Sequence, residues 1–166
     1  MNEYAVINHP DYYDNFYDYL EGINRKYMDK RALTWYTRKG EEMWCTYHDV
    51  YNYAVNVRTR LLKDGMAGKH IALVGENSLG WIVTYLAIAS CGGTVICIDT
   101  EQPDESLINS ISRADSVAVF ASESYIDIFD HLVAESDTVE KIYEMNLYKE
   151  PCTQEAPAFE KPQAAQ

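Results

Sequence analysis

The sequence predicts an α/β fold: an open, doubly wound, mostly parallel sheet with helices on both faces, plus an N-terminal helix and a short hairpin. Two observations predict it. From Ile71 onward, short unbroken apolar runs alternate with amphipathic stretches. Apolar runs without polar alternation are typical of strands buried on both faces, as in parallel sheets whose crossovers are helices. Four such runs predict strand, helix, strand, helix, strand, helix, strand.

The unit around which the chain is organised runs from His70 to Thr100. Ile71–Val74 is predicted to be a buried strand, and Asn77 or Ser78 can cap the helix that follows. Residues at helical spacing predict its apolar face: Trp81, Ile82, Tyr85, Leu86 and Ala89. Gly92 and Gly93 end this helix before a second strand at 94–98. A helix between two buried strands implies a parallel pair with a right-handed crossover.

The first third of the chain precedes this unit. After an irregular lead-in over residues 1–11, a helix is expected over 12–27 with the stripe Tyr13, Phe16, Tyr17, Leu20 and Ile23. Strands at 32–36 and 43–46 flank Lys39-Gly40, which predicts a hairpin.

A second helix is expected to begin at Thr46. Thr46 and Asp49 stand three residues apart, as in a capping box. Its apolar positions recur at helical spacing: Val50, Ala54, Val57 and Leu61. The helix should end at Lys63-Asp64-Gly65.

Three further elements follow the central unit. Pro103 suits the first turn of a helix with the inner positions Leu107, Ile108, Ile111 and Ala114. A strand at 117–121, a helix over 125–133 and a strand at 139–145 complete the alternation. We therefore expect one α/β domain over residues 12–149 and a disordered tail or linker over 150–166, which is rich in Pro, Ala and Gln.

Composition and charge exclude several partners. The 166 residues carry a formal net charge of −12, which argues against nucleic acid or an anionic membrane surface as the main partner. The N-terminus lacks the basic start and apolar core of a secretory signal, and the longest apolar run falls short of the roughly 20 residues that span a bilayer. The four cysteines, Cys45, Cys91, Cys97 and Cys152, form no CxxC pair. A cytoplasmic protein without a membrane anchor is expected.

The residues offer no self-sufficient active site. Gly75 and Gly80 have the spacing of a phosphate-binding loop, but Trp81 and Ile82 follow where Lys and Ser or Thr are needed. Asp99 follows a predicted parallel strand, where a phosphate-accepting carboxylate could lie, but we favour the simpler interpretation that Asp99 caps the turn into Pro103. The four histidines have no ligand spacing: His9, His48, His70 and His131. Neither catalytic residues nor metal ligands are predicted.

Three segments resemble a known family in their order and spacing. Trp44–Val50 is similar to the first core motif of adenylate-forming (AMP-binding) enzymes, and Lys69–Trp81 is similar to their next strand and turn. Tyr85–Pro103 looks like their second core motif, with Cys97 where the family usually has proline. The chain most resembles the N-terminal subdomain of AMP-forming long-chain acyl-CoA synthetases. The matching positions look structural: Thr46, Tyr47, Asn77, Trp81, Gly92, Asp99 and Pro103.

The resemblance implies chemistry that the rest of such an enzyme performs. These enzymes use ATP and Mg to convert a carboxylate into an acyl-adenylate and then transfer the acyl group to coenzyme A. Their Thr-Ser-Gly-Thr phosphate loop, Tyr-Gly-x-Thr-Glu segment and catalytic Lys motif are absent from the 166 residues. We therefore expect a chain that binds no cofactor alone, is inactive alone, and needs the missing C-terminal part of a synthetase as partner. The alternative is a stand-alone α/β binding or interaction module.

Overall fold

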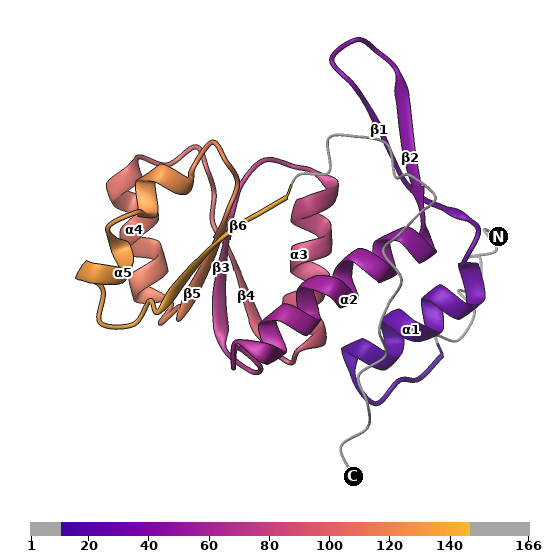
Figure 1. Cartoon of the computed structure of the whole chain (residues 1–166), viewed down its shortest axis with the longest axis horizontal. Helices are drawn as coiled ribbons and strands as arrows, with labels where there is room; N and C mark the ends of the chain where they lie inside the picture. Colours follow the sequence, from indigo (N-terminus) through magenta and orange to yellow (C-terminus); the bar gives the residue numbers. More distant parts are fainter. Residues whose placement is uncertain (1–10, 147–166) are drawn as a thin grey trace, which may run out of the picture.

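The computed structural model describes residues 11–146. Its elements follow the predicted alternation (Figure 1): α1 (Phe16–Tyr27), β1 (Arg31–Tyr36), β2 (Glu42–Thr46), α2 (Tyr47–Lys63), β3 (His70–Val74), α3 (Leu79–Ser90), β4 (Thr94–Cys97), α4 (Asp104–Arg113), β5 (Ala118–Ala121), the 3-10 helix η1 (Ile126–Phe129), α5 (Leu132–Glu135) and β6 (Lys141–Glu144). The predicted tail and most of the lead-in, with His9 and Cys152, lie outside the described residues.

The sheet has four parallel strands in the order β4-β3-β5-β6. The central strand β3 places Ile71 opposite Val95 on one side and opposite Ala118 on the other. The chain leaves β3 through α3 to β4, then crosses to the other side of β3 through α4. This confirms the predicted doubly wound α/β fold with helices on both faces.

Alternate residues of the strands feed two cores, one on each face of the sheet. Ile71, Leu73 and Phe120 pack with α2 and α3, whereas Ala72, Val74 and Val119 pack with α4, η1 and α5. Figure 1 shows α2 and α3 on one side of the sheet and α4 and α5 on the other. The strict alternation of side chains along a strand produces this division.

The hairpin β1–β2 stands apart from the four-stranded sheet and projects from the body (Figure 1). Its inner face, with Leu33, Trp35 and Cys45, packs against Val50 and Val83 of the helices. The hairpin prediction is thus confirmed, and the hairpin joins α2 directly at Thr46.

The buried face of α3 differs from the prediction. Its most buried apolar residues are Leu79, Val83, Ala87 and Ile88, whereas the predicted face of Trp81, Ile82, Tyr85, Leu86 and Ala89 is half-buried, with Tyr85 38% exposed. Almost every position of α3 is apolar, so spacing alone cannot distinguish two possible faces. The packing of α3 against both α2 and the sheet decides between them.

The predicted helix over 125–133 is also wrong. The segment forms η1, turns at Asp130 and His131, and continues as the short α5, with Val133 43% exposed. The break brings both Phe129 and Leu132 into the core on the α4 face.

Several boundaries also differ from the predictions. The helix expected from residue 12 begins at Phe16, because Asn15 caps it through the backbone N–H of Asp18. The last strand spans only Lys141–Glu144. Among residues 11–146, helices long and apolar enough to cross a membrane are absent.

Candidate functional site

The carboxyl ends of β3 and β5 are the first place to look for a site. The chain leaves β3 toward one face of the sheet and leaves β5 toward the other, which makes a switch point where α/β proteins commonly bind ligands. Here the Ser124 hydroxyl donates a hydrogen bond to Oε1 of Glu76 over 2.5 Å. The two loops are therefore joined directly across the switch point.

Side chains also fill the space below this bond. A Cβ on Gly75 would lie 2.5 Å from Cε of Met145 and 3.1 Å from Oγ of Ser122. Met145 and Ser122 are both buried. A side chain at position 75 would force the end of the Met145 side chain to move, so the switch point is packed with protein atoms.

The residues at this edge do not fit ATP or Mg. Glu76, Asp99 and Glu123 follow three neighbouring strands and would repel a phosphate. The turn after Gly75 offers no Lys, and the Ser78 hydroxyl already accepts the Trp81 backbone N–H at 3.1 Å. Clusters of three or more metal-ligating side chains do not occur within residues 11–146.

The predicted motif positions around α2 stabilise the start of that helix. Thr46 is its N-cap: its Oγ1 accepts the Asp49 N–H at 3.1 Å, while Oδ2 of Asp49 accepts the Thr46 N–H at 2.8 Å. This confirms the predicted capping box. Tyr47 is the first helical residue, and its ring centroid lies 5.5 Å from that of Tyr27 at the end of α1.

The motif positions around α3 do not converge on one point. Asn77 is exposed in the turn, and Ser78 rather than Asn77 caps the helix. Trp81 stacks on Tyr85 with centroids 5.7 Å apart. Gly92 ends the helix with φ of +71°, a left-handed conformation that glycine adopts without a Cβ clash.

The last two motif positions organise the turn into α4. Oδ1 of Asp99 accepts the Glu101 backbone N–H at 3.0 Å. Pro103 lies just before α4 and its carbonyl accepts the Leu107 N–H at 3.1 Å. Asp99 thus has the turn-forming contact that the sequence suggested as its simpler explanation.

Histidine and cysteine side chains are also scattered. Nδ1 of His48 lies 3.1 Å from Oδ1 of Asn24, and Nδ1 of His70 lies 2.9 Å from the Ala114 carbonyl. Burial raises the pKa of the thiols of Cys91 and Cys97, which disfavours the nucleophilic thiolate.

Sequence reasoning missed the densest polar cluster. Oδ2 of Asp64 accepts hydrogen bonds from Lys141 Nζ and the Tyr143 hydroxyl, each at 2.7 Å, and from Arg60 Nε at 2.9 Å. These bonds hold the pKa of Asp64 well below its usual range. Burial, followed by the bond to Asp64, raises the pKa of Tyr143. Nothing in the sequence links Asp64 to residues 77 and 79 positions away.

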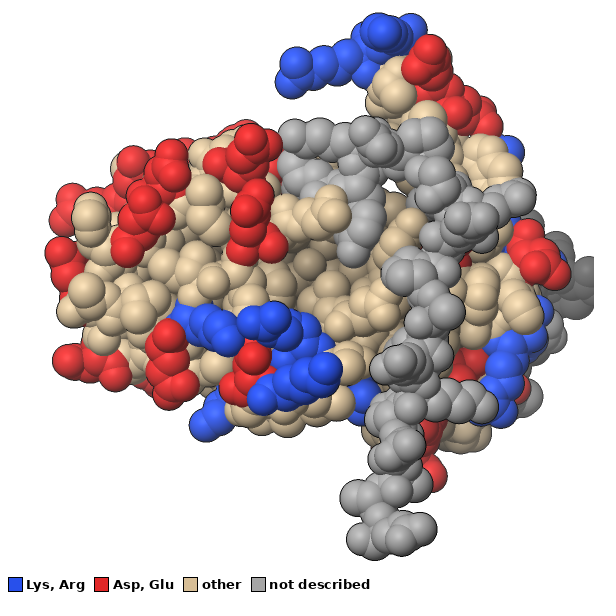
Figure 2. All heavy atoms as spheres, in the orientation of Figure 1, with Lys and Arg blue, Asp and Glu red and all other residues tan. Residues whose placement is uncertain are grey.

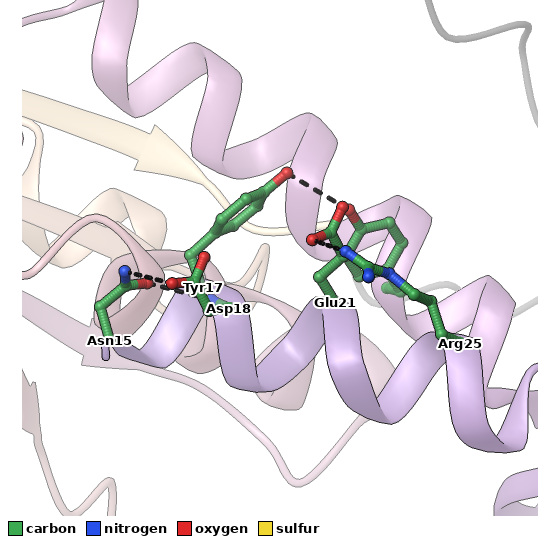
Figure 3. Close-up of polar contacts among 6 residues, drawn as sticks. Asn15, Tyr17, Asp18, Glu21 and Arg25 are labelled. Atoms are coloured by element: carbon green, nitrogen blue, oxygen red, sulfur yellow. Dashed lines mark hydrogen bonds and ion pairs between the residues drawn. The ribbon is translucent and has the colours of Figure 1, made fainter. Parts of the chain in front are cut away.

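A second cluster joins α1 to α2 (Figure 3). Asn15 and Asp18 lie at the start of α1, Glu21 pairs with Arg25 one turn further on, and the Tyr17 hydroxyl lies 3.3 Å from that of Tyr51. The Arg58 guanidinium lies 4.2 Å from the Tyr17 ring centroid, and its Nε donates to the Ser90 carbonyl at 3.2 Å. The cluster ties three helices together and has no arrangement of nucleophile and base.

Comparison with known proteins shows the family to which this chain belongs. The profile of the AMP-binding enzyme family matches residues 20–166. This chain belongs to the AMP-binding enzyme family. The nonribosomal peptide synthetase otaB of Aspergillus carbonarius is 26% identical over 111 residues, which are 66% of this chain and 6% of the synthetase.

Solved structures of AMP-binding enzymes share the fold. The anthranilate CoA ligase AuaEII in complex with anthranoyl-AMP has a TM-score of 0.67 at 22% identity, over 81% of this chain and 25% of the ligase. A putative long-chain-fatty-acid CoA ligase from Rhodopseudomonas palustris has a TM-score of 0.67 at 20% identity, over 80% of this chain and 33% of the ligase. The chain therefore spans a third or less of these AMP-binding enzymes.

Proposed function

We propose that this chain is the N-terminal part of an ATP-dependent, AMP-forming acyl-CoA synthetase that acts on fatty acids in the cytoplasm. In this proposal the chain is inactive alone and serves as scaffold. The carboxylate, ATP, Mg and coenzyme A are handled by a C-terminal part on the same or a separate polypeptide.

One observation carries the proposal: the chain reproduces the fold of CoA ligases over about a third of their length at most, and its own polar residues are used for structure. Glu76 and Ser124 bond to each other, Asp99 bonds to a turn amide, and Oδ2 of Asp64 accepts hydrogen bonds from three donors. These structural roles of the polar residues support the proposal that the chemistry belongs to another part of the synthetase.

A second candidate has specific support. The nonribosomal peptide synthetases otaB and ungA are curated sequence relatives, with ungA from Aspergillus violaceofuscus 31% identical over 78 residues. The same scaffold could then serve an adenylating unit for amino acids. The stand-alone binding module remains the alternative without chemistry.

ATP–pyrophosphate exchange tests the proposal. The isolated chain should give no exchange with fatty acids or amino acids, and exchange above background would overturn the assignment of chemistry to another polypeptide. In a second arm, residues 12–149 replace the equivalent segment of a fatty-acid CoA ligase. An active chimaera that prefers fatty acids supports the synthetase scaffold.

The chimaera also separates the alternatives. A folded chimaera without exchange activity favours the stand-alone module. A chimaera whose substrate preference changes from fatty acids to amino acids favours the hypothesis of a peptide synthetase. A matched chimaera with Asp99→Asn should retain activity, since Asp99 holds a turn rather than a ligand.

A further inference from the structure

One face of the sheet carries a cluster of aromatic side chains that the described helices cover only in part. We define this aromatic surface by Trp81, Tyr85 and Tyr143, since Phe120 and Met145, which belong to the same cluster as Trp81 and Tyr143, are buried at 6% and 3% exposure. Phe120 and Tyr143 stack with centroids 4.6 Å apart and Trp81 stacks on Tyr85, while Trp81, Tyr143 and Met145 share one hydrophobic cluster with Phe120. Tyr85 is 38% exposed, and Trp81 and Tyr143 are half-buried.

The arrangement of the helices explains why this area is incompletely covered. On this face α3 packs over β3 and β4, and α2 reaches β6 through Asp64 at its C-terminal end. The elements α4, η1 and α5 all pack on the opposite face. On the side of the aromatic surface, therefore, none of the described helices packs over the end of β6.

A basic border lies beside the aromatic surface. Arg60 and Lys141 both bind Asp64, and Lys63 stands one residue before it. Residues 58–69 hold four Lys and Arg against one Asp, whereas residues 70–146 hold thirteen Asp and Glu against two Lys and Arg. In the view of Figure 2, an uncharged area lies near the middle of the molecule, with blue side chains along its lower border.

We propose that residues 147–166 of this same chain dock on the aromatic surface. The segment starts two residues after Met145, a buried residue of the cluster against which Trp81 and Tyr143 pack. It carries three large apolar side chains that can pack against aromatic rings, Leu147, Tyr148 and Phe159. Its three Glu against two Lys complement the basic border.

Because residues 147–166 are covalently joined to the domain, they can bind the aromatic surface even if the contact is weak. A short flexible connection holds the segment at an effective concentration of about millimolar. Docking removes the exposed faces of Trp81 and Tyr85 from water, which is the driving force. The proposal concerns the chain alone and does not depend on the acid that a synthetase would activate.

Disulfide trapping in the full chain tests the proposal. Tyr85→Cys is combined with Cys91→Ser and Cys97→Ser, so that Cys152 of the segment is the natural partner for the new thiol. The matched control is Glu123→Cys in the same background. Glu123 is exposed at the same edge of the sheet, but the chain that follows it continues into η1, which packs on the opposite face.

The expected result is an intramolecular disulfide that forms about tenfold faster from Tyr85→Cys than from the control, because docking keeps the two thiols close. Equal rates in the two variants would overturn the proposal. Disulfides that form mainly between molecules would also overturn it, since they indicate a second copy as the occupant.

Fluorescence gives an independent measurement. With Trp35→Phe and Trp44→Phe, the remaining Trp81 reports on its own exposure. Replacing Tyr148 and Phe159 by Ser should raise acrylamide quenching of Trp81 about twofold, since undocking exposes one face of the indole. Ala158→Ser is the control and should change nothing. Unchanged quenching in the double variant would contradict docking.

Discussion

Lys141 on β6 reaches Asp64 at the end of α2 over 2.7 Å, although 77 residues separate them in the chain. Because Tyr143 and Arg60 bind the same carboxylate oxygen, Asp64 fastens the last strand of the sheet to a helix that precedes the sheet. Removing this one carboxylate should therefore loosen β6.

Asp64→Asn should make stability less dependent on pH. The native pKa of Asp64 is lowered, so its contribution is complete above the unfolded pKa of about 3.9 and is lost as pH falls toward the native value. The variant should melt several degrees below the parent at pH 7, and the difference should shrink below about pH 4. Thermal melts followed by circular dichroism from pH 7 to pH 2 measure it.

The control for this prediction is Asp137→Asn, which alters an exposed carboxylate in the loop before β6. It should track the parent at every pH. A constant difference between Asp64→Asn and the parent down to pH 2 would contradict the role of the ionised carboxylate.

Ile71→Ala should destabilise the protein strongly. Ile71 is fully buried in the central strand and packs with Leu61, Ile88 and Phe120. Burying less apolar surface and leaving a cavity costs about 2–5 kcal/mol of unfolding free energy. Urea unfolding measures it, and Leu62→Ala, at a side chain 42% exposed, should change it by less than about 1 kcal/mol.

Thr46→Ala should weaken the start of α2. The substitution removes the hydroxyl that caps the Asp49 N–H, at a cost of about 1 kcal/mol. Thr46→Ser keeps the hydroxyl and should retain most of the stability in the same urea experiment. An alanine variant as stable as the serine variant would show that the capping bond contributes little.

Gly92→Ala should strain the end of α3. Nothing lies within 4 Å of the added Cβ, so the cost comes from the left-handed backbone alone and amounts to about 1–2 kcal/mol. Gly92→Asn should cost less, because asparagine tolerates this conformation better. Equal melting temperatures for the two variants would argue against backbone strain.

The order and type of most elements were predictable because their signals are local. The Thr46–Asp49 capping box, the Lys39-Gly40 turn and the glycine after α3 each act within a few residues. Parallel pairing was predictable because the apolar strands are joined by helices. The rules on how strands are connected then allow only a few strand orders.

The features that could not be predicted from the sequence depend on contacts between residues that are far apart in the chain. The buried side of α3 is set by α2 and the sheet, and both possible sides are apolar. The turn at Asp130 arises because Phe129 and Leu132 both enter one core. The Asp64 cluster and the packed switch point combine residues from separate strands, for which no local pattern exists.

The strand order also bears on how the chain folds while it is being synthesised. β3 emerges from the ribosome first, β4 then finds it as a neighbour, β5 pairs with its other side, and β6 joins β5. Each strand after β3 therefore meets a partner that has already been synthesised. Sheet growth from the centre outward can thus keep pace with translation.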